Sequence, residues 1–228
     1  MTSNALNGLI AGLAEIEALQ RANPSPAKGS GLKRPEVVRA IGRSEVVLLS
    51  SHFERYFYAV YQEAVDAVCN SGALSDTLPE KFKLEHSRQP IEKISSMQYE
   101  RRSLILQEYS ARENWLWSPG APVSGLDAER LLTWMKAPTP KNLVRAYQLW
   151  GIDDIFNAIT RTNINNGRLR LKLRELVEKR NNIAHGDFTA EATYLDIVQY
   201  ISAVRKFCTS ADKRLARQLV ILIGTRPW

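Results

Sequence analysis

The amino-acid sequence predicts an all-α fold, a helical bundle with long antiparallel helices and an irregular insertion in its middle. Apolar residues return every three or four positions through most of the chain, which is the period of one face of a helix. Only 12 of the 228 residues are glycine and 10 are proline, so few of them interrupt these stretches. The composition, 44% hydrophobic and 24% charged, is that of an ordinary globular protein with its own core.

The charge balance favours acidic partners. Lys and Arg outnumber Asp and Glu by 31 to 24, and the isoelectric point lies near 9.5. This excess biases encounters toward phosphate-bearing molecules, although a solvated basic surface explains it equally well.

The sequence pattern gives no support for a metal site, a disulfide or a membrane segment. Cys69 and Cys208 lie far apart, and no second Cys or His stands at zinc-ligand spacing from either. The N-terminal stretch lacks a basic leader, and the apolar run 219–223 is far shorter than the ~20 residues of a membrane span. We therefore expect no metal, no cofactor and no membrane association, and a cytoplasmic location.

Residues 1–34 are expected to form an N-terminal helix and a linker ahead of the main domain, 35–228. Within 5–20, apolar side chains at spacings of 3, 4 and 3 define one helix face, which should end before the Asn-Pro pair at 23–24. Residues 25–33 contain two glycines and a proline and are expected to be a connection.

One long helix is predicted over 35–70. Proline at the first helical position costs no hydrogen bond, and Asn-Ser-Gly at 70–72 ends the helix. Tyrosines at positions 56, 58 and 61 are interpreted as packing residues rather than as base-stacking ones. The predicted buried stripe consists of Val46, Leu49, Phe53, Phe57, Val60, Ala64 and Val68.

The insertion, about 72–140, has the least regular pattern. We expect helices near 90–110, with Pro90 at the start, and near 126–135, separated by the Ser-Pro-Gly-Ala-Pro segment 118–122. A lid or core role is favoured over a nucleic-acid platform for its three tryptophans. These are Trp115, Trp117 and Trp134.

Helical spacing resumes at 140–150, and Asp153 or Asp154 is expected to cap the short helix that follows. Residues 168–174 then alternate basic and apolar side chains, which is a strand pattern. We nevertheless predict a helix, because apolar residues from Leu169 onward continue at helical spacing. Opposite charges also stand at i,i+4, Arg174 with Glu178 and Glu175 with Lys179.

The apolar seam of this helix is the face on which its leucines recur, and Arg180 occupies a position on it where the helical spacing predicts Leu or Ile. An unpaired buried guanidinium costs several kcal/mol, so Arg180 must face a counter-charge, a wet cleft or an anionic ligand. On spacing alone, a structural ion pair is the simpler interpretation. Gly186 is placed to end the helix, and a last helix is expected over about 191–223.

His185 favours a catalytic interpretation of the same segment. Histidine is the side chain best suited to proton transfer near neutral pH, and this one stands five residues after Arg180. Asn181, four residues before His185 on the same helical face, could orient the imidazole or bind a phosphate oxygen. On an ideal helix Arg180 and His185 are about 140° apart in azimuth and about 7.5 Å apart in rise. A second copy of the motif across a symmetric interface would therefore supply the missing group.

Arg180-Asn181-x-x-x-His185, preceded by a basic Leu/Val-rich stretch and followed by Gly186, resembles the R-x(4-6)-H signature of the HEPN superfamily. Segments 47–56 and 149–156 also resemble the RiboL-PSP-HEPN group. The resemblance covers roughly 35–223 and leaves the first 34 residues outside.

The resemblance implies a helical domain that dimerises through its motif helices and acts as a metal-independent endoribonuclease. Its catalytic residues would be His185 for proton transfer, Arg180 for the charge on the phosphorane, and Asn181. The neighbouring 2′-OH would attack, giving a 2′,3′-cyclic phosphate and a 5′-hydroxyl, so DNA should be inert. RNA contacts are assigned to Arg174, Lys179 and Asn182.

Similar proteins often act as toxins in toxin-antitoxin or antiviral defence systems, so the expected partners are RNA, a second copy of the chain and an antitoxin protein. Two alternatives stay open: a HEPN module that binds RNA or protein without cutting, and a structural helical protein in which Arg180 serves a buried ion pair. His52 and His86 are interpreted as ordinary polar residues. Glu54 reaches the site only if the long helix lines it.

Overall fold

The computed structural model describes residues 1–22 and 35–228. Over these residues the chain is helical, without a β-strand and with one isolated antiparallel bridge, between Leu74 and Pro122. The all-α prediction is confirmed, whereas the predicted connection 25–33 lies outside the described residues. The elements are α1 (Asn4–Ala22), α2 (Pro35–Asn70), η2 (Ser75–Thr77), α3 (Glu80–Ser96), α4 (Tyr99–Trp117), α5 (Ala128–Leu132), α6 (Pro140–Leu149), α7 (Ile155–Ile159), α8 (Asn163–Ala184) and α9 (Tyr194–Ile223).

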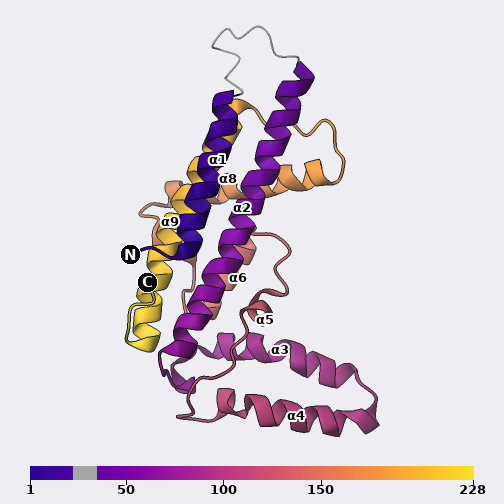
Figure 1. Cartoon of the computed structure of the whole chain (residues 1–228), viewed down its shortest axis with the longest axis vertical. Helices are drawn as coiled ribbons and strands as arrows, with labels where there is room; N and C mark the ends of the chain where they lie inside the picture. Colours follow the sequence, from indigo (N-terminus) through magenta and orange to yellow (C-terminus); the bar gives the residue numbers. More distant parts are fainter. Residues whose placement is uncertain (23–34) are drawn as a thin grey trace.

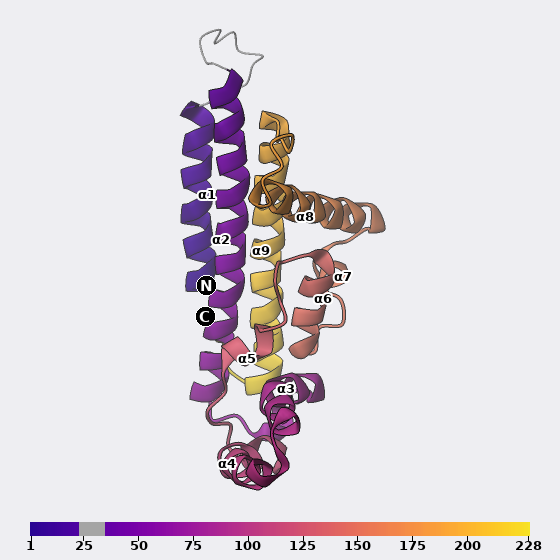
Figure 2. The ribbon, with the colours of Figure 1, turned by 90° about the vertical axis from the view of Figure 1, so that its right-hand side faces the viewer.

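Helices α1, α2 and α9 lie side by side along the long axis of the molecule (Figures 1 and 2). The predicted apolar face of α1 is buried in the same core as α2 and α9. At Gly12 of α1 a Cβ atom would collide with the ring of His52 on α2, so glycine allows these two helices to approach closely. The N-terminal helix is thus part of the bundle.

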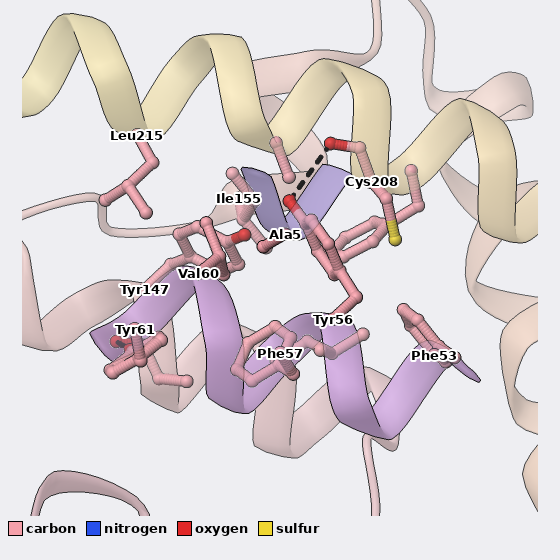
Figure 3. Packing of buried hydrophobic residues seen from close by; sticks show 14 of the residues in the cluster. Ala5, Phe53, Tyr56, Phe57, Val60, Tyr61, Tyr147, Ile155, Cys208 and Leu215 are labelled. Carbon is pink, nitrogen blue, oxygen red and sulfur yellow. Dashed lines mark hydrogen bonds between the residues drawn. The ribbon is translucent and has the colours of Figure 1, made fainter. Parts of the chain in front are cut away.

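Aromatic rings from three helices fill the centre of the core (Figure 3). Phe53 of α2 meets Phe207 of α9 edge to face, with ring centroids 5.9 Å apart. Phe57, one turn further along α2, meets Tyr147 of α6 in the same way at 5.7 Å. Such edge contacts add about 0.5–1.5 kcal/mol per pair to the gain from burial. The whole predicted stripe of α2 is buried.

The packing role predicted for the α2 tyrosines holds for Tyr56 and Tyr61, whereas Tyr58 is 46% exposed. Tyr56 and Tyr61 are buried, and the Tyr56 hydroxyl donates to the carbonyl oxygen of Cys208 at 3.2 Å (Figure 3). Tyr58 is more exposed, and its hydroxyl donates to the carbonyl oxygen of Met135 at 3.1 Å.

The insertion is more helical than its sequence indicates. The single helix expected near 90–110 is replaced by a hairpin of α3 and α4 at one end of the molecule (Figures 1 and 2). Met97 and Gln98 reverse the chain with extended backbones, at ψ angles of 159° and 141°. Pro90 does not start a helix but lies inside α3, where the missing N–H removes one hydrogen bond from the helix.

The second helix expected in the insertion, 126–135, is reduced to the five residues of α5. Asp127 caps the start of α5 by accepting a hydrogen bond from the Glu129 amide at 2.9 Å. The packing role predicted for the tryptophans holds for Trp115 and Trp134, which are partly buried against the core. Trp117 is exposed, and its indole nitrogen donates to the hydroxyl of Ser87.

The ends of α7 and α9 follow local hydrogen bonding. Asp154 caps α7, as predicted, by accepting from the amides of Phe156 and Asn157. The last helix begins at Tyr194 rather than near 191, because Thr193 and Asp196 form a capping box in which each side chain accepts from the other's backbone amide.

Helix α8 crosses the long bundle steeply, and its C-terminal end projects past α2 (Figures 1 and 2). The alternating segment 168–174 is helical, as predicted. The two expected i,i+4 ion pairs are absent from the described structure, since Glu175 pairs instead with Lys172 at 2.8 Å, and Arg174 and Glu178 point to solvent. This leaves Arg174 and Lys179 without the carboxylate partners that the spacing suggested.

Candidate functional site

The motif stands where α8 ends. The amide of Gly186 donates to the carbonyl oxygen of Ile183 at 3.2 Å, and the amide of Asp187 donates to that of Asn182 at 3.0 Å. This pair of hydrogen bonds is a Schellman motif, and it requires the left-handed backbone that Gly186 adopts at φ +83°. The prediction that Gly186 ends the helix is confirmed. His185, the last residue before the turn, is thereby held at a fixed position on the end of α8.

Arg180 lies at the edge of the core and faces α2. Its Nη2 is 3.7 Å from Oε1 of Glu54, and its Nη1 donates to the side-chain oxygen of Asn181 at 3.2 Å. The side chains of Arg180 and Glu54 are 34% and 25% exposed, so water still reaches both. Ser50, one turn before Glu54, donates to the same carboxylate oxygen at 3.4 Å. Of the three environments considered for Arg180, the structure therefore supplies a counter-charge beside water.

His185 has a different environment. The residue is exposed, and its backbone amide continues the helix by donating to the carbonyl oxygen of Asn181 at 2.9 Å. The imidazole makes no hydrogen bond or ion pair within residues 1–22 and 35–228. Its two nitrogens therefore remain accessible to a ligand, whereas the guanidinium of Arg180 is directed toward α2.

The residues assigned to RNA contacts divide between two sides of α8. Arg174 precedes His185 by eleven residues, about three full turns, and lies within about 20° of it around the helix. Arg174 and Asn182 are exposed, like His185. Lys179 is half-buried and lies about 120° away. Arg174 and Asn182 thus share a solvent-facing surface with His185, and Lys179 lies on its flank.

The loop that follows His185 is tied to α2. Nη1 of Arg43 donates to the carbonyl oxygens of Asp187 at 2.7 Å and Ala190 at 3.4 Å. The carboxylate of Asp187 accepts from the hydroxyl of Thr189 at 2.6 Å and from its amide at 2.8 Å. These hydrogen bonds hold the pKa of Asp187 below its usual value. Further along, Arg39 pairs with Glu191 at 3.5 Å.

Two open clefts lie at the insertion. One, of about 260 Å³, is lined by α3, α4 and Arg130, and another, of about 600 Å³, lies between α3 and α6. Neither includes a residue of 180–185. Within the described part of the chain, no three His, Cys, Asp or Glu side chains converge as a metal site would require, and no helix is long and apolar enough to cross a membrane.

A comparison with protein families identifies the motif's setting. The model of the RiboL-PSP-HEPN family matches residues 10–217, which is most of the sequence. The chain belongs to the RiboL-PSP-HEPN family. The match begins inside α1, so this family's domain includes much of the N-terminal helix that the sequence comparison left outside. No curated protein and no solved structure matched the chain.

The two other histidines of this RiboL-PSP-HEPN chain lie in packed surroundings. His86 in α3 is fully buried, and its Nε2 accepts from the Asp127 amide at 3.0 Å. Burial lowers its pKa, and the nearby carboxylate of Glu113 opposes that shift. His52 covers Gly12 and stands 3.5 Å from Glu15. Both are engaged in holding helices together, in agreement with their interpretation as ordinary polar residues.

Glu54 is the contact that sequence reasoning left unassigned. It lies on α2, more than 120 residues before Arg180, and nothing in the local pattern distinguishes it from the other acidic residues of that helix. The available signal was indirect. A counter-charge was one of the three environments expected for a cation on the apolar seam of α8, and Glu54 lies one residue after Phe53 of the buried α2 stripe.

Proposed function

We propose that this RiboL-PSP-HEPN chain is a metal-independent endoribonuclease that cuts RNA through attack by the 2′-OH. One observation carries the proposal: the end of α8 presents an accessible histidine, His185, five residues after an arginine, Arg180, that remains partly solvated. These are the two side-chain types that such a cleavage needs, a proton carrier and a fixed positive charge.

The steps of the reaction assign a separate role to each of these side chains. The 2′-oxygen forms a bond to phosphorus and gives up its proton to a base, and the bond from phosphorus to the 5′-oxygen breaks as that oxygen gains a proton. His185 fits both proton transfers, which require one neutral and one protonated imidazole. Arg180 fits the charge on the phosphorane, and Asn181, which accepts from its guanidinium, would help to orient it. The products are a 2′,3′-cyclic phosphate and a 5′-hydroxyl.

Two copies of the chain suit this chemistry better than one. The guanidinium of Arg180 faces α2, while the imidazole of His185 lies on the exposed side of α8, so a single chain separates the two groups. A two-fold interface at the projecting end of α8 would bring together two histidines and two arginines. Arg174, Lys179 and Asn182 would then contribute to the walls of the shared cleft and contact RNA.

The deciding experiment incubates the purified chain with single-stranded RNA and with the same sequence as DNA, each in the presence of EDTA. We expect cleavage of RNA alone, ending in a 2′,3′-cyclic phosphate, by a species that sediments as a dimer at micromolar concentration. Loss of cleavage in EDTA with rescue by Mg²⁺ or Mn²⁺ would exclude the mechanism. A monomer that cuts at full rate would exclude the shared site.

A module that binds RNA without cutting it is the second candidate, and the contact between Arg180 and Glu54 favours it. An arginine that already faces a carboxylate is less available to stabilise a phosphorane, whereas the exposed Arg174 and Asn182 could still contact RNA. The same cleavage assay separates the two, because a binding module retains RNA affinity but releases no cyclic phosphate.

A role as a toxin in a toxin-antitoxin or antiviral defence system, with an antitoxin protein as partner, is part of the proposal and rests on family resemblance. Induced expression in a bacterial host tests it. Wild-type protein is expected to arrest growth and His185→Ala to leave it unchanged at equal abundance, and a gene beside this one would be tested for rescue. Equal growth with both would reject the toxin role without affecting the cleavage assay.

A further inference from the structure

Phe188 is a large apolar side chain that the described chain leaves in solvent. It is 87% exposed, on the loop between α8 and α9, three residues after His185. Burying a phenylalanine gains roughly 1.5–3 kcal/mol, so such exposure leaves a favourable interaction unused. Three residues of chain span at most about 10–11 Å, which keeps Phe188 within reach of a nucleotide beside the group that His185 contacts.

The loop that presents Phe188 is fixed on both sides. The Schellman motif fixes Asp187, whose carboxylate closes a turn onto Thr189. Arg43 binds the carbonyl oxygens of Asp187 and Ala190 from α2. The ring therefore stands on a backbone held by hydrogen bonds before and after it. A backbone held in this way reduces the conformational freedom that is lost when the ring binds a ligand.

The surroundings of Phe188 fit a nucleotide. The guanidinium of Arg43 lies 5.7 Å from the centroid of the ring, and the chain neighbours, Asp187 and Thr189, are polar. A flat apolar face next to a cation offers stacking for a base and charge for its phosphate. A nucleobase needs only one such face beside a cation, and the residues before and after Phe188 in the chain are polar.

We infer that Phe188 is a stacking platform for a nucleobase next to the cleaved phosphodiester, which makes single-stranded RNA the substrate class. This rests on the proposed ribonuclease function. Attack by the 2′-oxygen in line with the 5′-oxygen requires a nucleotide that has left regular helical stacking. An aromatic side chain beside the catalytic histidine replaces the stacking that the base gives up.

The test measures binding of a single-stranded oligoribonucleotide to His185→Ala, which is not expected to cut, and to His185→Ala/Phe188→Ala. A set of oligonucleotides, each with one abasic position, is measured in parallel. Removal of the ring should weaken binding of the intact RNA by about 5- to 150-fold. One abasic position should weaken binding to His185→Ala by a similar factor and have no further effect once the ring is gone.

Two further variants serve as controls. Phe188→Trp should restore affinity, because indole also stacks on bases. Tyr99→Ala removes an equally exposed aromatic, 81% exposed at the start of α4, and should leave affinity unchanged. The inference is overturned if the ring's removal weakens all abasic oligonucleotides equally while sedimentation shows dissociation of a dimer, because Phe188 would then be an interface residue. An unchanged affinity for intact RNA also overturns it.

Failure of the proposed function gives a different result. If wild-type protein releases no cyclic phosphate, but Phe188 and one base position remain coupled in binding, nuclease activity is rejected and Phe188 is a base-stacking site of an RNA-binding module. If wild-type protein cuts RNA and no coupling is found, the platform alone is rejected. Absence of any RNA binding rejects both.

Discussion

Two regions of this molecule each contain a histidine, a glutamate and an arginine, but the histidine is enclosed in one region and exposed in the other. In the insertion, Glu113 lies between His86 and Arg130, at 3.4 Å from the imidazole Nδ1 and 2.7 Å from the guanidinium. At the end of α8, Arg180 approaches Glu54 at only 3.7 Å, and the imidazole of His185 is exposed. The first trio is enclosed between α3, α4 and α5, and the second lies at the edge of the bundle.

Burial and hydrogen bonding distinguish the two trios. His86 accepts an amide hydrogen at Nε2 and faces Glu113 with Nδ1, so neither nitrogen is left for a substrate. His185 has no partner for either nitrogen within the described residues, and the backbone around it is fixed by the Schellman motif. The first arrangement fits a structural role, and the second presents an accessible imidazole in a defined place. Residue type alone does not separate them.

Replacing His185 and replacing His86 should give the largest difference in cleavage rate. We expect His185→Ala to lower the cleavage rate by about 10² to 10⁴ with RNA affinity mostly retained, because proton transfer is lost and the cationic surface stays. His86→Gln should keep the rate per folded molecule. Cyclic-phosphate release and gel shifts on both variants check this. A His185→Ala protein that cuts at the wild-type rate would end the nuclease interpretation.

Replacement of Arg180 should affect both binding and chemistry. Arg180→Ala removes the charge that we propose stabilises the phosphorane, so cleavage should fall by about 10² to 10³. It also removes one phosphate contact per site, so the slope of log affinity against log salt should become shallower by about one. Binding measured between about 50 and 300 mM salt, a range over which the Debye length shortens strongly, gives that slope. The control is Arg101→Ala, which removes an exposed cation of α4 outside the motif, and its slope should equal that of wild type.

Stability should depend on pH through the buried histidine. Burial lowers the pKa of His86 from its ordinary value of 6.5, so below pH 6.5 the unfolded chain takes up a proton that the folded chain resists. The stability that the neutral imidazole provides is present above pH 6.5 and is lost as the pH falls through the folded pKa. The cost of His86→Gln, roughly 1–3 kcal/mol at pH 7.5, should therefore shrink toward pH 5.5, by less than about 1.4 kcal/mol per pH unit.

Denaturant titrations of the two proteins at both pH values measure this difference. Glu45, whose pKa burial raises from 4.5 to about 7, makes stability fall as the pH rises over the same range. It acts equally in both proteins, so comparing the variant with wild type cancels it. A cost of His86→Gln that stays constant from pH 7.5 to 5.5 would contradict the assignment.

Periodicity and end signals in the sequence predict the long helices well. The bounds of α2 and the buried stripe between them follow from a proline, an Asn-Ser-Gly stop and spacing of apolar residues. The hairpin of α3 and α4 could not be anticipated in the same way. Its chain reversal at Met97 and Gln98 contains no glycine or proline, and Pro90 gives a false boundary inside α3.

The candidate site likewise combines features that the sequence predicts with contacts that it does not. Arg180, Asn181, His185 and the stop at Gly186 lie on one helix end, so local spacing brings them together. Their contacts on α2 depend on how α8 crosses the bundle, which spacing does not encode. The i,i+4 pairs expected in α8 failed for a related reason, since a long exposed side chain can pair with several neighbours at nearly equal energy.

The smallest expected effect is the coupling between Arg180 and Glu54. Both side chains keep contact with water, so a double-mutant cycle with Arg180→Leu and Glu54→Gln should give a coupling below about 1 kcal/mol. Arg180→Leu alone should change stability little, because leucine extends the apolar seam formed by Leu173 and Leu176, and the remaining Glu54 stays hydrated.

The same cycle on Arg130 and Glu113 provides the comparison. Glu113 is almost fully buried, so Arg130→Leu leaves a carboxylate that water cannot reach, and the loss should approach the roughly 3–5 kcal/mol of a broken buried pair. Urea titrations of all six variants decide the matter. If Arg180 and Glu54 couple as strongly as the insertion pair, and His185→Ala still cuts RNA, the arginine is a structural anchor. A weak coupling, combined with the loss of cleavage in Arg180→Ala, instead means that the arginine contributes to the reaction and little to the fold.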